Sequence, residues 1–329
     1  MKALVIYLSL LFAPGDSLLV MFWNLENFFD PADSLSCAAD HEFSPEGERH
    51  WTRRRFYRKC EAVAKAVLWI ASQKGQYPDI FAVAEVENRF VMRSILRATA
   101  LDKLDYGIIH FDSPDPRGID VGLFYRKSRL RKLRAKPCPI PGVATRDILL
   151  AEFALSGAEG EAVSGAFSRT GLRSNAEETA SPAALAVLVN HHPSKYGGPS
   201  SAERREKAVD RLAFLADSLA AQGYRHIIAL GDFNDTPDNE VYKRLPLENA
   251  SLPLHRRGVG SIRFNGKWEL IDLVFLSPAL ASCPVEVVRV PFLLTKDTVH
   301  SGQKPLRTYT GPRYTAGISD HLPVLVKIP

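Results

Sequence analysis

The sequence predicts an α/β fold in which two β-sheets pack face to face, with helices outside the sheets and loops gathered at one rim. Three observations support this prediction. Apolar runs of strand length recur along the chain and are separated by longer segments with a helical period. Acids, amides and histidines recur at the points where these strands end. No short repeat and no Pro-rich or Ser-rich linker divides the chain.

The first half of the chain alternates strands with two helices. The predicted helices are amphipathic and lie at 56–72 and near 89–99, on either side of a strand that leads into Glu85. Residues 31–52 are mixed and polar, so we expect a long loop there. The strands share short apolar runs and lie at 18–23, 79–84, 106–111, 119–125, 130–135 and 147–153.

The second half contains an anomalous segment. Residues 156–182 are rich in Gly, Ser, Ala, Glu and Arg and show almost no periodicity, so we expect an inserted mobile loop. A substrate lid and an inert insertion are both open interpretations of it. A capping box, Ser200 to Glu203, predicts the start of a helix whose apolar face extends to Leu219. The later strands lie at 184–190, 227–230, 269–276 and 322–328.

Length and composition place limits on the class of protein. The chain has 329 residues, which is enough for one large domain or two ordinary ones. Its 46% hydrophobic and 24% charged residues are typical of a globular protein with a buried core. The formal net charge of +5 mildly favours a polyanionic partner such as nucleic acid or acidic lipid. Three short arginine clusters add little, because a solvated face explains each of them. No obligate protein partner is evident.

Residues 1–16 resemble a signal peptide. Met1 and Lys2 precede about ten apolar residues, which are too few to span a bilayer, and small or turn-forming residues follow. A buried first strand is the alternative, although 18–23 already supplies one. We therefore expect a periplasmic or secreted protein, or a cytoplasmic one if the signal is absent. No later segment is long and apolar enough to be a membrane helix.

The four cysteines, at positions 37, 60, 138 and 283, lack the spacing of metal ligands. Export would allow disulfides, but their pairing cannot be deduced from the sequence. A zinc or iron–sulfur site built on cysteine is therefore not expected.

The most informative strand end follows residues 227–230. Gly231 precedes Asp232 and Asn234, and the period of two in a strand places these two side chains on the same side. A carboxylate can accept a proton from water, and an amide can hold a phosphoryl oxygen or orient that water. An ordinary strand end with an Asx turn is the alternative.

Two other strand ends repeat this pattern. Asn24 and Glu26 follow the first strand, and Glu85 and Glu87 follow the strand at 79–84. Asp272 differs, because it lies among aliphatic residues of a predicted strand. Burial of an unpaired carboxylate is costly, so we expect a His or Arg partner for it.

Hard oxygen ligands dominate this set of polar residues. Glu26, Glu85 and Asp320 suit Mg²⁺, or alternatively Mn²⁺ or Ca²⁺, rather than a closed zinc site. A divalent ion together with His, Asn and Asp side chains suits attack of water on a phosphoester.

Five polar segments follow one another along the chain: Trp23-Asn24-Leu25-Glu26-Asn27, Glu85-Val86-Glu87-Asn88, Asn190-His191-His192-Pro193-Ser194, Gly231-Asp232-Phe233-Asn234-Asp235 and Ser319-Asp320-His321-Leu322-Pro323. In this order they resemble the motif series of the endonuclease/exonuclease/phosphatase superfamily. The resemblance covers nearly the whole chain after the signal and implies one catalytic domain at 17–329. It also implies a DNase I-like fold, which is a four-layered α/β sandwich with two central mixed β-sheets.

The resemblance also implies roles for the site residues. The metal ligands would be Glu85, Glu26 and Asp320, and the substrate phosphate would contact Asn24 and Arg117. The catalytic residues would be His191, Asp232, Asn234, Asp272 and His321. Among these, Asp232 would position or deprotonate the attacking water, and His321 would pair with Asp272.

One position departs from the family pattern. His192 stands where relatives carry Trp, so two adjacent histidines compete for one role. Since neighbours on a strand face opposite ways, only one of His191 and His192 is expected to point into the site. His191 matches the second histidine of the DNase I and sphingomyelinase branches.

These observations predict a metal-dependent phosphodiesterase that cleaves nucleic acid by attack of water on phosphorus. A phosphatase or phosphodiesterase acting on inositol phosphates or sphingomyelin-type headgroups is the alternative. A catalytically inactive binding module would not need every charged site residue. A calcineurin-like phosphatase would need an Asp-x-His near the first strand, where this chain has Asn24-Leu25-Glu26.

Overall fold

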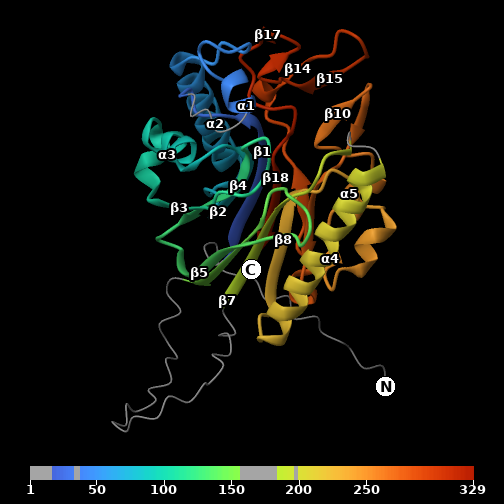
Figure 1. Cartoon of the computed structure of the whole chain (residues 1–329). Coiled ribbons are helices and arrows are strands. Elements are labelled where there is room, and N and C mark those ends of the chain that lie inside the picture. Colours follow the sequence, from blue (N-terminus) through green and yellow to red (C-terminus); the bar gives the residue numbers. More distant parts are fainter. Residues whose placement is uncertain (1–16, 33–37, 156–183, 196–198) are drawn as a thin grey trace, which may run out of the picture.

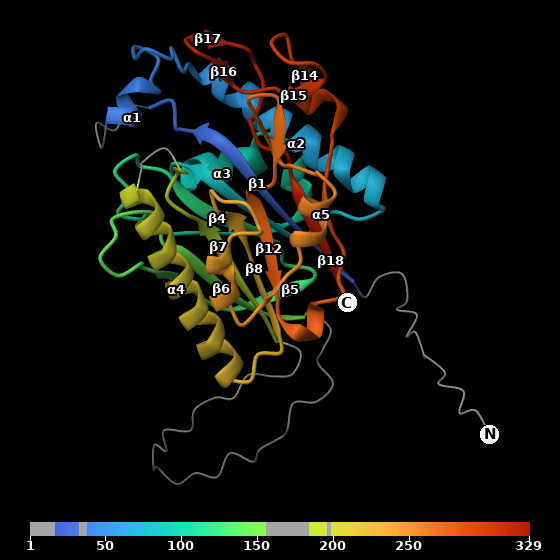
Figure 2. The ribbon, with the colours of Figure 1, turned by 90° about the vertical axis from the view of Figure 1, so that its right-hand side faces the viewer.

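The structure is a computed structural model that describes residues 17–32, 38–155, 184–195 and 199–329. The predicted signal peptide at 1–16 and the predicted insertion at 156–182 lie outside these residues. Two mixed sheets of six strands each form the centre of the molecule. Figures 1 and 2 show α2 (Arg53–Lys74) and α4 (Pro199–Ala221) on opposite sides of the two sheets.

The first sheet has the strand order β13-β18-β1-β2-β4-β3. Its central strands β1 and β2 run parallel, and the other pairs run antiparallel. The strands are β1 (Leu18–Phe28), β2 (Ile80–Val86), β3 (Tyr106–His110), β4 (Asp120–Arg126), β13 (Val285–Val287) and β18 (Val324–Ile328).

The second sheet has the strand order β5-β6-β7-β8-β12-β9. Its central strands β7 and β8 also run parallel, so each sheet carries one parallel pair in its middle. The strands are β5 (Leu130–Cys138), β6 (Ile148–Leu155), β7 (Ala184–His191), β8 (His226–Asp232), β9 (Glu248–Asn249) and β12 (Asp272–Leu276).

Shorter elements cover the ends of the sheets. Three two-stranded ribbons pair β10 with β11, β14 with β15 and β16 with β17. The ribbon strands are β10 (Ile262–Phe264), β11 (Lys267–Glu269), β14 (Leu294–Lys296), β15 (Gln303–Pro305), β16 (Tyr309–Thr310) and β17 (Arg313–Tyr314). The remaining helices are α1 (Ala38–Glu42), α3 (Arg89–Arg97), α5 (Leu252–Arg256), η1 (Ala100–Leu104), η3 (Glu240–Arg244), η4 (Pro278–Leu280) and η5 (Pro291–Leu293).

Alternation along the strands builds two layers of core. In β1, Val20 and Phe22 face the second sheet, where they belong to the same buried cluster as Leu188 of β7. The intervening Met21 faces the other way and packs in the cluster that contains Val63 of α2. Because both faces of the sheet are covered, the strands consist of nearly continuous apolar runs. This arrangement confirms the predicted fold class.

The structure corrects several predicted boundaries. The first strand does not end at Trp23, because β1 continues to Phe28 through an irregularity in its pairing with β2. The predicted strand at 269–276 is interrupted, and β12 begins only at Asp272. The capping box at Ser200 does not start its helix, because α4 already includes Pro199. A short helix, α1, lies in the predicted loop at 31–52.

Two further expectations concern the whole described chain. Cys60, Cys138 and Cys283 are free cysteines. None of the helices in the described ranges has both the length and the apolar character that a membrane-spanning helix requires.

Candidate active site

The candidate site lies where the two parallel strand pairs end. Parallel neighbours place their carboxyl ends at the same edge of a sheet, so β1 and β2 bring Glu26 and Glu85 together. In the second sheet, β7 and β8 bring His191 level with Asp232. The antiparallel strand β12 starts at this same rim and places Asp272 directly opposite Asp232.

A hydrogen-bonded pair of Asp272 and His321 lies beside Asp232. Nδ1 of His321 is 2.8 Å from Oδ2 of Asp272, and its Nε2 is 3.8 Å from Oδ2 of Asp232. Burial lowers the pKa of His321, but the two carboxylates outweigh burial and raise this pKa well above its usual value. The buried Asp272 therefore has the partner that its burial requires.

Each carboxylate oxygen of the buried Asp232 accepts a hydrogen bond. Asn24 Nδ2 donates to its Oδ2 over 3.0 Å, and the backbone N–H of Asn234 donates to its Oδ1 over 2.9 Å. Burial nevertheless raises the pKa of Asp232 to about 7, although the nearby His321 opposes the rise. A carboxylate whose pKa lies near neutrality is suited to accept and release a proton at that pH.

The two adjacent histidines face opposite ways. Nε2 of His191 lies 3.8 Å from Oε1 of Glu85 and 3.7 Å from Oδ2 of Asp232. The ring of His192 instead packs against Phe233, with 4.5 Å between the ring centroids. Only His191 therefore points toward the other candidate residues.

Both imidazoles are neutral near pH 7. Burial is the largest cause that lowers the pKa of His191 well below its usual value, and the cations of Arg146 and Arg117 add to it. Burial and Arg146 lower the pKa of His192 to about 3. A neutral His191 can still donate one hydrogen bond to an incoming group.

Strained backbone occurs at the ends of these strands. Glu26, Asn27, Glu85 and Asn234 all have positive φ, between 46° and 59°. Such conformations are uncommon for residues other than glycine and cluster at functional sites. Contacts hold them here, since the N–H of Asn27 donates to Oε2 of Glu85 over 2.8 Å.

Glu26 is engaged by two groups from the 307–308 segment. Nε of Arg307 donates to its Oε1 over 2.8 Å, and the backbone N–H of Thr308 donates to its Oε2 over 2.9 Å. Nη2 of Arg307 also lies 3.0 Å from Oδ2 of Asp320. Burial, with the nearby Asp320, raises the pKa of Glu26 to about 7.

Lys59 is a buried cation in the same region. Its Nζ donates to the backbone oxygen of Glu26 over 2.6 Å and to Oγ1 of Thr308 over 2.9 Å. Burial lowers the pKa of Lys59 to about 8. The sequence analysis missed Lys59, although one signal existed: it lies on the apolar face of its helix, between Phe56 and Val63.

The remaining predicted residues occupy less direct positions. Asn24 and Asn234 both use their side-chain amides within the protein, since Asn234 Nδ2 donates to the backbone oxygen of His192 over 3.0 Å. Arg117 is 44% exposed, and its Nη2 lies 2.7 Å from Oδ1 of Asn27 and 3.6 Å from Oε2 of Glu85. The sequence analysis also missed Arg307, which no motif in the chain indicates.

The donor set fits a hard divalent cation. Carboxylate oxygens predominate, and ligand atoms of Asp232, Asp272 and His321 all lie within 4.8 Å of one another. Glu26, Glu85 and Asp320 do not form such a tight group among the described residues. Burial is the largest cause of the high pKa of Glu26, and the nearby Asp320 adds to it. A bound cation would favour the ionised form of this carboxylate.

The model of the Endonuclease/Exonuclease/phosphatase family matches residues 19–186 and 176–329. The chain therefore belongs to this family, whose members hydrolyse phosphoester bonds and generally use divalent metals. The predicted family is thus confirmed.

Solved structures are similar to this chain in fold. Truncated Caenorhabditis elegans TDP2 has a TM-score of 0.57 at 14% identity, with 95% of this chain and 98% of that chain covered. A Bacteroides thetaiotaomicron protein of the same family has a TM-score of 0.55 at 15% identity, covering 95% and 97%. D. rerio TDP2 complexed with single strand DNA product has a TM-score of 0.50 at 16% identity, covering 95% and 99%. None of the curated proteins matches this chain significantly.

Proposed function

We propose that the protein is a metal-dependent phosphodiesterase that cleaves nucleic acid by attack of water on phosphorus. The main support is that four distant segments bring Glu85, His191, Asp232 and His321 together. Nε2 of His191 lies within 3.8 Å of Glu85 and 3.7 Å of Asp232, and Nε2 of His321 lies 3.8 Å from Asp232. The net charge of +5 favours a polyanionic substrate. The similar D. rerio structure contains single strand DNA product, which supports the same choice.

Asp232 is the proposed group that receives the proton of the attacking water. Its pKa of about 7 makes proton transfer in both directions feasible near neutral pH. Asn24 and Asn234 orient this carboxylate by donating hydrogen bonds to it. The Asp272–His321 pair adds a protonated imidazole at its side, which stabilises negative charge there.

His191 is the proposed hydrogen-bond donor to a phosphoryl oxygen. Because its ring is neutral and buried, donation through an N–H is better supported than transfer of a proton from a charged imidazolium. Arg117 reaches the opposite side of Glu85 and is exposed enough to meet a phosphate. Glu85, Glu26 and Asp320 are the proposed metal ligands. When bound there, a Mg²⁺ or Mn²⁺ ion supplies positive charge that offsets charge on the phosphoryl oxygens.

The test compares wild-type protein with Glu85→Gln on several phosphoesters. The substrates are single-stranded DNA, RNA, plasmid, bis-p-nitrophenyl phosphate, inositol phosphates and sphingomyelin, each with Mg²⁺, Mn²⁺, Ca²⁺ or EDTA. We expect cleavage of nucleic acid that EDTA abolishes. The Gln variant should be at least about 100-fold slower, because a metal contributes several kcal/mol to the transition state.

Two outcomes would contradict the proposal. Undiminished activity in EDTA and in Glu85→Gln would exclude the metal role. Turnover of inositol phosphates or sphingomyelin without nucleic acid cleavage would assign the site to the alternative substrates. Glu61→Gln is a suitable control, because it removes the same charge from an exposed position of α2 away from the candidate ligands.

We also propose that residues 1–16 are a signal peptide and that 17–329 form one exported catalytic domain. Sequencing the N-terminus of protein recovered from the periplasm or medium tests this. A protein that begins at Met1 and stays in the cytoplasm would refute it.

A further inference from the structure

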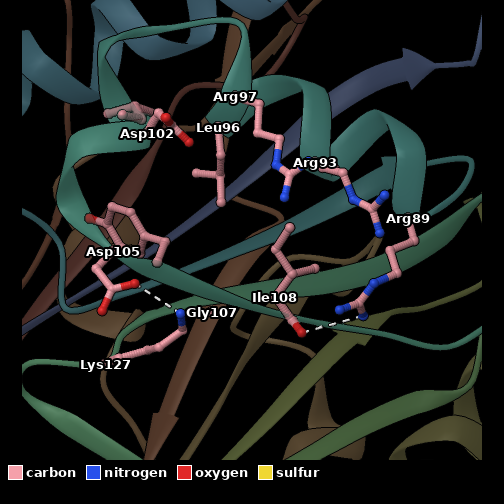
Figure 3. Close-up of a pocket in the computed structure, with 11 residues that line it drawn as sticks. Arg89, Arg93, Leu96, Arg97, Asp102, Asp105, Gly107, Ile108 and Lys127 are labelled. Atoms are coloured by element: carbon pink, nitrogen blue, oxygen red, sulfur yellow. Dashed lines mark hydrogen bonds and ion pairs between the residues drawn. The ribbon is translucent and has the colours of Figure 1, made fainter.

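A groove with a basic wall lies at the edge of the first sheet, outside the candidate site. It has a volume of about 370 Å³ and runs between α3 and β3, which is the edge strand of that sheet. Figure 3 shows the side chains of Arg89, Arg93 and Arg97 along one side of α3, with β3 opposite. We call these three residues the arginine row.

Few acidic or hydrogen-bonding groups of the protein neutralise the positive charges of the arginine row. All three side chains are exposed, and Arg89 reaches only the backbone oxygen of Ile108, at 3.5 Å. Arg93 and Arg97 have no hydrogen bond or ion pair in the part of the chain that the structure describes. Of the two acids in the groove, Asp105 is paired with Lys127 at 2.8 Å, which leaves Asp102 alone against the row.

The first two charges of the row are unfavourable for the helix, whereas Arg97 in the last turn is favourably placed. Like charges four residues apart repel each other, and the row contains two such pairs. Arg89 is also the first residue of α3, where a cation is unfavourable, and the first turn contains no acid. An anionic ligand along the row would relieve both effects.

We propose that the arginine row binds the backbone of a single-stranded nucleic acid that continues from the candidate site. This inference rests on the proposed function, because it extends the same substrate beyond the cleaved bond. Successive arginines are separated by about 6 Å along the helix axis, which is close to the repeat of phosphates in an extended strand. The row begins four residues after Glu85, so it starts beside the site.

An exposed aromatic side chain lies at the start of the row. Phe90 is 44% exposed and is stacked on Phe56, with 5.7 Å between the ring centroids. Phe90 lies outside the lining of the groove and next to Arg89, so a base that stacks on it would lie at the site end of the row.

The test measures binding of a fluorescent single-stranded oligonucleotide by anisotropy, as a function of salt, in an Asp232→Asn background with Mg²⁺. We compare the row variant Arg89→Gln/Arg93→Gln/Arg97→Gln with the parent. Loss of three phosphate contacts should reduce the slope of log affinity against log salt by about 2, at about 0.7 for each contact. The single Arg93→Gln variant should reduce it by about 0.7.

The control is Arg131→Gln/Lys132→Gln/Lys136→Gln on β5, which removes the same charge from exposed positions of the other sheet. Its slope should equal that of the parent. In the wild-type background, the row variant should hydrolyse bis-p-nitrophenyl phosphate at the parental rate, since this substrate is too small to reach the row.

Three results would overturn the inference. The first is an equal slope for the row variant and the parent, and the second is an equal reduction in the β5 control. The third is loss of binding to phosphatidylserine vesicles with unchanged oligonucleotide binding, which would assign the row to a membrane. Failure of the wild-type protein to cleave any nucleic acid would instead refute the proposed function, whatever the slopes are.

Discussion

Replacement of Asp232 by Asn should stabilise the metal-free protein while it abolishes turnover. The two side chains have nearly the same shape, so the change removes a negative charge from a buried position. Ionisation there is unfavourable, because burial raises the pKa of Asp232 from 3.8 to about 7. The difference of about 3 pKa units corresponds to about 4 kcal/mol, which is an upper limit for the gain.

One loss reduces this gain. The new amide nitrogen would face Nδ2 of Asn24, now 3.0 Å from Oδ2, so one hydrogen bond worth about 1 kcal/mol is lost. The attraction between Asp232 and His321 already limits the rise in the pKa, so its loss is not subtracted again. We therefore expect a net gain of about 1–3 kcal/mol in the free energy of unfolding above pH 7.

The gain should depend on pH with a definite sign. The folded state holds the Asp232 proton up to about pH 7, whereas the unfolded chain releases it near pH 4. The wild-type protein therefore loses stability between about pH 4 and pH 7, and the Asn variant does not incur this loss. The advantage of the variant should be smallest near pH 4 and constant above about pH 8.

The assay combines thermal unfolding in EDTA at pH 5 and pH 8 with turnover in Mg²⁺. At pH 8 the midpoint of the variant should exceed that of the wild type by about 2 °C or more, and by less at pH 5. Turnover should fall at least about 100-fold, as for loss of a general base. A midpoint below that of the wild type at pH 8, or more than a tenth of wild-type activity, would refute the reasoning.

Two pairs of substitutions separate catalytic from structural contacts. His191→Ala should slow turnover about 100-fold through loss of a donor, whereas His192→Ala should keep activity within tenfold but destabilise the fold by about 2 kcal/mol. Equal mild losses in both would contradict the assignment of His191. Lys59→Met should lower kcat at least about tenfold with a small change in stability, because the backbone oxygen of Glu26 loses its donor. Lys65→Met, on the exposed face of α2, is the matched control, and the same loss of kcat there would refute a specific role for Lys59.

The pairing of Asp272 shows what the sequence could establish. A carboxylate among aliphatic residues requires a partner, and that physical argument alone predicted a His or Arg near Asp272. The choice of His321 came from the family resemblance, because the two residues are 49 positions apart. The existence of most strands and the two packed sheets could be predicted because the strands depend on local periodicity, whereas the end of the first strand and the start of β12 could not.

The bulge at the end of β1 shows what the sequence could not establish. A period of two predicted that Asn24 and Glu26 point to the same side of a regular strand. The structure has positive φ at Glu26 and Asn27, and Asn24 donates to Asp232 while Glu26 accepts from Arg307. Nothing in the residue type of a glutamate indicates a left-handed conformation, since its side chain disfavours it.

The buried cations were unpredictable for a related reason. The position of Lys59 on the apolar face of its helix signals burial, but only the tertiary structure reveals that it contacts Glu26 and Thr308. Arg307 belongs to a segment in which the sequence predicted no element, and it connects Glu26 with Asp320. Local patterns therefore indicate where acids gather, but not which cations approach them.

The location of the strain supports the proposed site independently of the motifs. Half of the eight non-glycine residues with positive φ in the described ranges lie at this rim: Glu26, Asn27, Glu85 and Asn234. Each such conformation costs roughly 1–3 kcal/mol and persists where surrounding contacts enforce it, as Lys59 does by binding the backbone oxygen of Glu26. The fold therefore keeps an unfavourable backbone conformation where the carboxylates converge, and this conformation is a part of the site.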